Sequence, residues 1–351
     1  MQDYEIYEFD DLIPNKEVLK SAVLILGNGA SIAVSDCFFY SKLFDMACSN
    51  SILDCNSREL FEKLDTTDFE LVLNKLRQAS IINNVLDLDN DNVALKTYDS
   101  IRKALINVVK ENHVKHGDVL FKLFNIKKFM EQFKTVISLN YDLLIYWAMM
   151  SNNFEANYKM KDCFTAKMDD GNLGFDYETQ KYRSGYGGVS DPTLVFYPHG
   201  SLILATNDNN EELKITVSSQ NNLFEEISEK WSKNYVPLFV SEGDSKQKLR
   251  TIKRSSYLNY VYENILVDLG KFAVIYGWRL AEQEEHLVNR IFHKNGVSKV
   301  MISIYISEKS SVNDIRDEQD RIINLLKRRN KEIEVKFFNA SNENCWVNYE
   351  G

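Results

Sequence analysis

The chain is patterned as short apolar runs that end abruptly in polar or glycine residues, each followed by a stretch with helical periodicity. Residues 21–26 and 135–139 are the first two runs, and residues 272–276 and 299–306 are two later ones. An unbroken apolar strand is typical of a parallel sheet that is covered on both faces. Strands that alternate with helices therefore predict an α/β fold, Rossmann-like, with a doubly wound parallel sheet.

Two long segments interrupt this alternation. From about residue 43 to 131 the apolar residues recur at helical spacing, most clearly at 68–76 and 98–114. Residues 152–192 are irregular and rich in aromatic residues and glycine, and we interpret them as a lid or as the lining of a substrate mouth. We expect one domain over residues 1–351, with a helical insertion at about 43–131 and an irregular insert at about 152–192.

Composition narrows the class of protein. The 351 residues carry a formal charge of −9, which disfavours nucleic acid as the main partner. Basic clusters at 246–254 and 327–331 are interpreted as solvated helix faces. Five cysteines without a C-x-x-C pair indicate reduced thiols, and neither a secretion signal nor an apolar run of roughly 18 residues is visible. We expect a soluble cytoplasmic protein that neither spans nor binds a membrane.

The most informative stretch is Thr135-Val-Ile-Ser-Leu-Asn-Tyr-Asp142. Its strand delivers Asn140 and Asp142 to the carboxyl end, just before a predicted helix at 143–150. Open α/β sheets build their ligand crevices at such ends. Asn140 could equally be a helix cap, since asparagine and aspartate are preferred there.

Three further polar segments stand at strand ends. Gly27-Asn-Gly-Ala-Ser31 follows the first strand, where its glycines would admit a pyrophosphate or would serve the turn alone. Pro198-His-Gly-Ser201 and Gly277-Trp-Arg-Leu280 follow two later strands. His113 with His116, and the group Glu284, Glu285, His286 and His293, are interpreted as surface residues without a metal.

Together these four segments resemble the motif set of the sirtuin family, in the same order. The turn at 27–31 is similar to the sirtuin G-A-G-x-S turn, residues 138–142 to T-Q-N-x-D, and residues 277–280 to G-T-S-L. His199 falls at the place of the sirtuin catalytic histidine. The resemblance implies a sirtuin-like fold that binds NAD⁺.

The resemblance also implies a role for each matching residue. Asn140, Asp142 and His199 would form the catalytic set: Asn140 on the nicotinamide ribose or an attacking water, Asp142 on the carboxamide, and His199 as general base. The residues expected to bind NAD⁺ are Gly27, Asn28, Gly29, Ala30, Ser31, Tyr141, Gly277 and Trp278. Of these, Gly27, Gly29, Ala30 and Ser31 would line the pyrophosphate and Gly277 the adenosine half.

The chain departs from the sirtuin deacylases in lacking the paired cysteines of their zinc module, and Asn28 replaces an alanine. It is more similar to the zinc-free, sirtuin-like effectors of bacterial antiphage defence. That resemblance implies an NAD⁺ glycohydrolase without a metal, a homo-oligomer, and in some relatives a HerA-type ATPase partner. ADP-ribosyl transfer, or binding of NAD⁺ or ADP-ribose without catalysis, are the alternatives.

Overall fold

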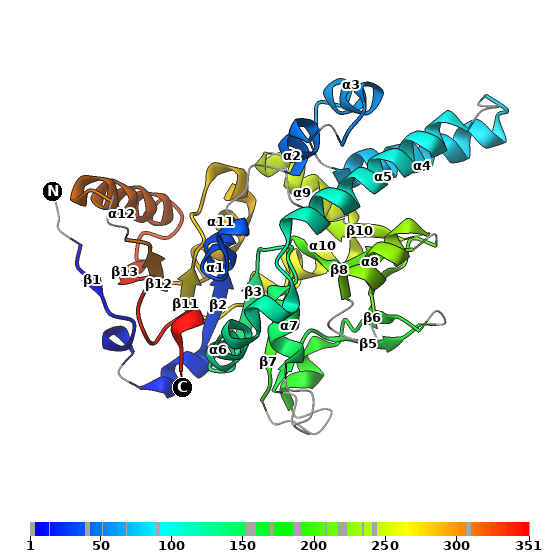
Figure 1. Cartoon of the computed structure of the whole chain (residues 1–351). Helices are drawn as coiled ribbons and strands as arrows, with labels where there is room; N and C mark the ends of the chain where they lie inside the picture. Colours follow the sequence, from blue (N-terminus) through cyan, green and yellow to red (C-terminus); the bar gives the residue numbers. More distant parts are fainter. Residues whose placement is uncertain are drawn as a thin grey trace.

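The computed structural model of the chain describes residues 4–13, 15–38, 43–50, 52–67, 69–88, 92–151, 159–168, 171–184, 191–207, 209–216, 223–233, 235–240, 244–306 and 310–350. The described helices and strands form a large parallel sheet flanked by helices, a smaller antiparallel sheet, and a long helical hairpin that projects from them (Figure 1). The expectation of an α/β fold with a parallel sheet is confirmed.

All eight strands of the large sheet run parallel, in the order β1-β13-β12-β11-β2-β3-β7-β4. Their bounds are β1 Ile6–Tyr7, β2 Ala22–Leu26, β3 Thr135–Ser138, β4 Met160–Lys161, β7 Thr193–Phe196, β11 Phe272–Tyr276, β12 Lys299–Ile304 and β13 Glu334–Asn339. From β2 the chain proceeds through β3 to β7 on one side and later through β11, β12 and β13 on the other. The order therefore reverses between β2 and β11, which is where open α/β sheets place their ligand crevice.

Burial explains why the central strands are apolar throughout. Every residue of β2, β3 and β7 is buried, as are four of the five residues of β11. A strand covered on both faces has no solvent side on which polar residues could alternate. The apolar runs at 21–26, 135–139 and 272–276 are therefore the centre of the sheet.

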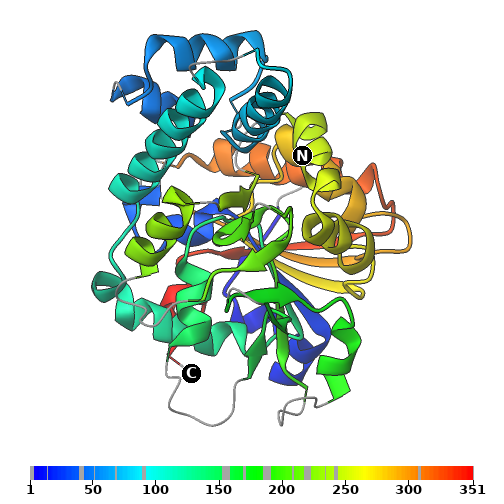
Figure 2. The same ribbon diagram turned by 90° about the vertical axis from the view of Figure 1, so that its right-hand side faces the viewer.

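The second sheet was not predicted. It is antiparallel, in the order β10-β8-β9-β6-β5, and Figure 2 shows it, mainly in green, in front of the parallel sheet. Its strands are β5 Phe164–Lys167, β6 Leu173–Phe175, β8 Gly200–Thr206, β9 Glu212–Lys214 and β10 Val236–Phe239. The segment at 152–192 supplies β5 and β6 of this sheet and β4 of the parallel sheet, so the prediction of an irregular insert is wrong for the described part of the segment. Residues 152–158, 169–170 and 185–190 lie outside the described residues.

Between residues 43 and 131 all the described elements are helices, as predicted. They are α2 Leu43–Ser49, α3 Cys55–Lys63, α4 Phe69–Val85, α5 Val93–Asn112, a 3-10 turn His116–Val119, and α6 Leu120–Met130. The other helices are α1 Asn28–Ile32, α7 Leu144–Met150, α8 Leu223–Ser232, α9 Ser245–Arg254, α10 Ser256–Tyr260, α11 Glu285–Ile291 and α12 Val312–Lys327. Within the described part of the chain, no helix combines the length and apolarity needed to cross a membrane.

Candidate functional site

The four polar segments singled out in the sequence lie on four consecutive strands. The strands β11, β2, β3 and β7 are neighbours in that order, and the segments beginning at Gly277, Gly27, Leu139 and Pro198 follow their carboxyl ends. In a parallel sheet these ends share one edge. The structure thus brings together four stretches that are up to about 250 positions apart in the chain.

Backbone packs directly on backbone where β2 and β11 end. A Cβ atom on Gly27 would lie 2.4 Å from the Cα of Trp278, and one on Gly29 would lie 2.7 Å from the Cα of Gly277. Gly277 itself has a φ of +68°, and a Cβ there would lie 2.3 Å from the amide nitrogen of Ala30. These glycines are required by the packing of the two turns, whatever ligand the turns hold.

Several amides of the predicted phosphate turn donate within the protein. Gly27 N–H donates to the Tyr276 carbonyl at 3.0 Å, Gly29 N–H to the Gly277 carbonyl at 2.8 Å, and Ala30 N–H to the Gly27 carbonyl at 2.9 Å. The helix α1 that follows has only five residues. Gly27 and Ala30 are buried, whereas Asn28 is exposed and Gly29 is half-buried, so Asn28 and Gly29 form the accessible part of this turn.

Asn140 connects the end of β3 to this turn. Its Nδ2 donates to the Gly27 carbonyl at 2.9 Å and to the Ser31 hydroxyl at 2.8 Å. Ser31 Oγ in turn donates to Asp142 Oδ2 at 2.5 Å. Asn140 and Asp142 are 8% and 5% exposed. The sequence-predicted residues Asn140, Asp142 and Ser31 therefore form one hydrogen-bonded cluster.

The side chain of Asp142 also contacts the start of helix α7. Its Oδ1 accepts from the Leu144 amide at 2.9 Å, but the N-cap position is Leu143, so the prediction that Asn140 caps this helix is wrong. Burial raises the pKa of this carboxyl, while the bonds from Ser31 and Leu144 counteract that rise. The two bonds stabilise the ionised form in a site that water reaches poorly.

His113 supports the same helix start, which corrects its interpretation as a surface residue. Its Nε2 accepts from the Leu143 amide at 3.1 Å, and its Nδ1 lies 2.9 Å from the Val114 carbonyl. A carbonyl only accepts, so the ring is neutral with its proton on Nδ1. Burial lowers the pKa of His113 to about 4, and its ring packs edge-on against Trp147.

His199 is buried behind the strand end instead of lying open to it. It is 2% exposed, and its carbonyl accepts from the Val240 amide at 2.7 Å. The next residue, Gly200, has a φ of +74°, and a Cβ there would lie 2.1 Å from the Leu238 carbonyl oxygen. The His-Gly pair thus turns the chain from β7 into the second sheet against β10.

A second histidine, missed in the sequence analysis, pairs with His199. The two Nε2 atoms are 3.2 Å apart, and Nδ1 of His286 is 3.3 Å from Ser245 Oγ. Ser245 Oγ accepts from the His286 amide at 2.9 Å, which leaves its hydroxyl proton for Nδ1. The tautomer that fits both contacts has His286 Nε2–H donating to Nε2 of His199. A backbone hydrogen bond to Leu139 partly counteracts the lowering of the pKa of His199.

Both rings are held neutral. Burial, followed by the positive charge of Lys248, lowers the pKa of His286 to about 3. The same two causes, with His286 as a third, place the pKa of His199 well below its ordinary value. Nε2 of His199 is occupied by His286 and the residue is buried, so base catalysis by His199 requires that its bond to His286 opens.

Two interpretations of the surrounding residues need correction. Lys248, assigned to a solvated helix face, is buried, and its Nζ lies 3.9 Å from Glu284 Oε1. His286, assigned to a charged helix face, is also buried. Lys248 lies one helical turn before the buried Ile252, and this spacing in the sequence predicts that Lys248 is buried on the same helix face. His286 is buried because α9 packs on α11, which the sequence does not show.

The remaining predicted residues pack or orient their neighbours. The Trp278 ring is buried, donates its indole N–H to Glu284 and stacks on Phe292, so it fills space inside the protein and does not offer a face to a cofactor. Tyr141 is half-buried, and its ring stacks on Phe239 with centroids 5.1 Å apart.

Two residues that the sequence analysis missed hold the glycine turns. Ser303 Oγ accepts from the Gly277 amide at 2.9 Å. Trp346, near the end of the chain, donates its indole N–H to the Ala30 carbonyl at 2.8 Å. Neither residue belongs to a recognisable sequence motif. Each acts through one hydrogen bond to a backbone atom, so its role could not be predicted from the sequence.

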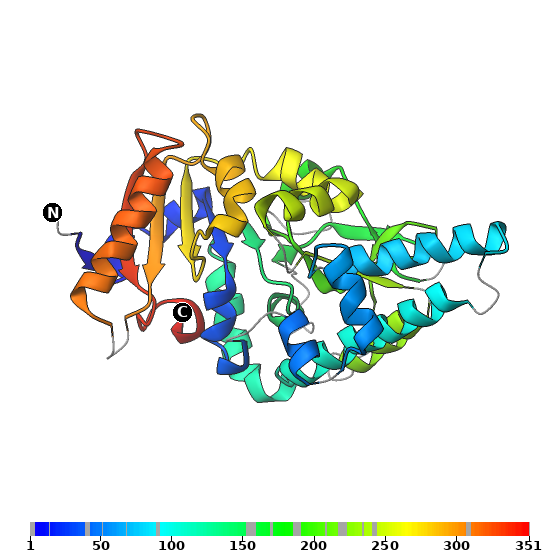
Figure 3. The same ribbon diagram turned by 90° about the horizontal axis from the view of Figure 1, so that it is seen from above.

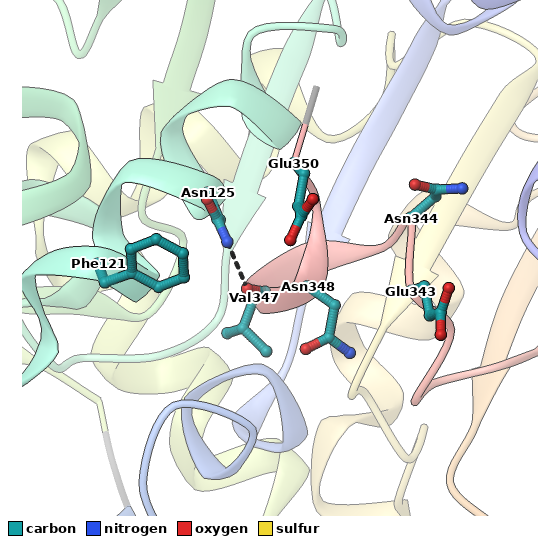
Figure 4. Close-up of a pocket in the computed structure, with 7 residues that line it drawn as sticks. All are labelled: Phe121, Asn125, Glu343, Asn344, Val347, Asn348 and Glu350. Carbon is teal, nitrogen blue, oxygen red and sulfur yellow. Dashed lines mark hydrogen bonds between the residues drawn. The ribbon is translucent and has the colours of Figure 1, made fainter.

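A separate polar cavity of about 540 Å³ opens between α6 and the C-terminal segment (Figure 4). It is lined by Phe121, Asn125, Glu343, Asn344, Val347, Asn348 and Glu350. None of the predicted site residues lines this cavity.

Over the described part of the chain, no three His, Cys, Asp or Glu side chains are grouped so that they could hold a metal ion.

Residues 24–346 match a family model described as Domain of unknown function (DUF4917). The match begins inside β2 and ends at Trp346, so it encloses every element of the strand-end cluster. No curated protein matches the chain.

Proposed function

The chain belongs to the DUF4917 family, and we propose that it is an NAD⁺ glycohydrolase of sirtuin-like type that releases nicotinamide and ADP-ribose. The observation that carries the proposal is Asn140, buried at the edge where β2, β3 and β11 end and bound to the turn at Gly27 and Ser31. Strand ends beside a reversal of strand order are the usual site of nucleotide binding in such sheets. The motifs at this edge stand in the same order as in sirtuins, and this order supports NAD⁺ as the substrate.

Asn140 is held so that its amide nitrogen faces the protein. Because Nδ2 donates to Gly27 and Ser31, the side chain has a fixed orientation in which Oδ1 is the remaining polar atom. An amide oxygen accepts from a ribose hydroxyl or from an attacking water. Asp142 contributes chiefly by holding Ser31, and through it Asn140, because both of its oxygens already accept a hydrogen bond.

The reaction needs little beyond this positioning. The bond from the ribose to the nicotinamide nitrogen breaks, the electron pair neutralises that nitrogen, and water supplies the oxygen that joins the ribose. Nicotinamide leaves as a neutral molecule, so no general acid is required, and the site stabilises the positive charge that develops on the sugar. The released water proton goes to His199 once its bond to His286 has opened.

Nicotinamide release from NAD⁺, followed by chromatography, tests this assignment. We expect Asn140→Ala to lower the rate about 100-fold or more, since it removes a positioning group at the reacting centre. Asn125→Ala is the matched control, because Asn125 is also buried and its Nδ2 also donates to a backbone carbonyl, that of Val347. Circular dichroism of both variants separates lost chemistry from lost folding.

Equal nicotinamide release by Asn140→Ala and the parent chain would overturn the site assignment. A second function, binding of NAD⁺ or ADP-ribose without catalysis, is favoured by the closed pairing of His199 with His286. Calorimetric binding of ADP-ribose by a chain that releases no nicotinamide would assign that function instead. ADP-ribosyl transfer would appear as label from NAD⁺ retained on protein.

A further inference from the structure

The outer part of the α4–α5 hairpin exposes a concentrated apolar surface. Its large apolar side chains are 44% to 78% exposed, and we call them the hairpin-tip patch: Ile81, Ile82, Val85, Leu86, Leu88, Val93 and Leu95. These seven are nearly half of the 15 large hydrophobic side chains that are exposed across the described residues. Scattered single exposures are normal, whereas such a cluster marks an interaction site.

This part of the hairpin has no core of its own. The buried stripe of α4 ends at Ser80, and that of α5 begins at Tyr98. Among the described residues between them, none is buried. A helix pair is stabilised mainly by packing an apolar face, so the tip lacks that stabilisation within a single chain.

The hairpin is placed where a partner can reach it. Figures 1 and 3 agree that α4 and α5 extend away from both sheets. The base is fixed by contacts of α5 with α2 and α8, and of α4 with β10. The body of the chain therefore holds the patch out into solvent.

We propose that the hairpin-tip patch binds the same patch of a second copy of this chain, so that the tips of two hairpins pack together as four helices. Seven side chains of this size and exposure leave roughly 700 Å² of apolar surface per chain, close to the about 800 Å² per partner of specific, stable interfaces. The seven side chains of the patch are apolar, and an apolar surface can pair with a copy of itself, as a twofold interface requires. This inference does not depend on the proposed activity.

Sedimentation equilibrium of the full chain tests the proposal, with a substitution in the patch and one outside it. We expect the parent chain to behave as a dimer of 40.8 kDa subunits, and Val85→Glu to raise the dissociation constant at least about 30-fold, because each dimer buries the new charge twice. Val312→Glu is the matched control, since Val312 is 72% exposed on another helix and Val85 is 78% exposed.

Three results would overturn the proposal: a monomeric parent chain at micromolar concentration, a dimer that Val85→Glu leaves intact, or a dimer that Val312→Glu weakens equally. A monomer that captures a different protein through the patch would assign another occupant.

Discussion

The imidazole of His286 determines which nitrogen of His199 carries a proton. His286 donates to Nε2 of His199, so the single proton of the neutral His199 ring is on Nδ1. Removing His286 leaves a buried lone pair without a donor, which permits the His199 ring to change tautomer or rotate. His286 is thus a positioning residue, one hydrogen bond away from the group expected to take the water proton.

We expect His286→Leu to lower kcat for nicotinamide release about 10- to 100-fold with little change in KM, because it disturbs the orientation of His199 and not the binding of NAD⁺. His286→Gln should recover most of the loss, since its amide can donate to Nε2 of His199. The acid limb of the pH–rate profile should move to higher pH in His286→Leu, because His286 is one of the groups that lower the pKa of His199.

His293→Leu serves as the control, because His293 follows the same helix but contacts the Val267 carbonyl instead of His199. An unchanged pH profile in His286→Leu, with activity lost only in proportion to unfolded protein, would leave His286 a purely structural residue.

At the scale of elements, the turns at the ends of β2 and β11 pack so closely on each other that neither has room for a side chain at its glycines. We expect Gly277→Ala to destabilise the protein by about 3 kcal/mol or more, since it adds a close contact with the Ala30 amide to a positive φ. Chemical denaturation measures this change.

Two other glycines separate the causes. Gly117→Ala places its Cβ in open space without a positive φ, and it should change stability little. Gly171→Ala also has open space but a φ of +80°, so it reports the cost of the backbone conformation alone. If Gly277→Ala cost no more than Gly171→Ala, the close approach of the two turns would not be a source of strain.

The sequence predicts the central elements because each is specified locally. β2, β3 and β11 are continuous apolar runs, and the polar segments that follow them have spacings that predict a common edge. The antiparallel sheet was missed because the apolar run within β8 looks the same whether its neighbours run parallel or antiparallel. His286 was missed because the packing of α9 on α11, a tertiary contact, decides which face of α11 is buried.

At the scale of the whole molecule, two neutral histidines make folding sensitive to acid: His113, which is half-buried, and His286, which is buried. The pKa of His113 is about 4 and that of His286 about 3, against an ordinary 6.5. Below pH 6.5 these histidines bind protons in the unfolded chain but stay neutral in the folded protein. Their contribution to the free energy of unfolding is therefore complete above pH 6.5, and it is lost as the pH falls toward 3 to 4. Burial raises the pKa of Asp142, which acts in the opposite direction in a lower pH range.

We therefore expect the urea midpoint of unfolding to fall steadily from pH 7 to pH 4.5 as a result of histidine titration. His113→Gln should reduce this slope, because it removes one of the titrating groups and keeps an acceptor for the Leu143 amide. A midpoint that stays constant over this range would show that the folded histidines take up protons as readily as the unfolded ones.

The bond from Trp346 to the Ala30 carbonyl has a consequence for how the protein is made. The two residues are 316 positions apart, so at about 5–20 residues per second the ribosome completes the first turn of the site roughly half a minute before its last contact exists. Until then the turn lacks the indole that holds it. Competence for the proposed binding of NAD⁺ should accordingly arise only after Trp346 has been synthesised, and a chain that stops before Trp346 should leave the cofactor pool of the cell untouched.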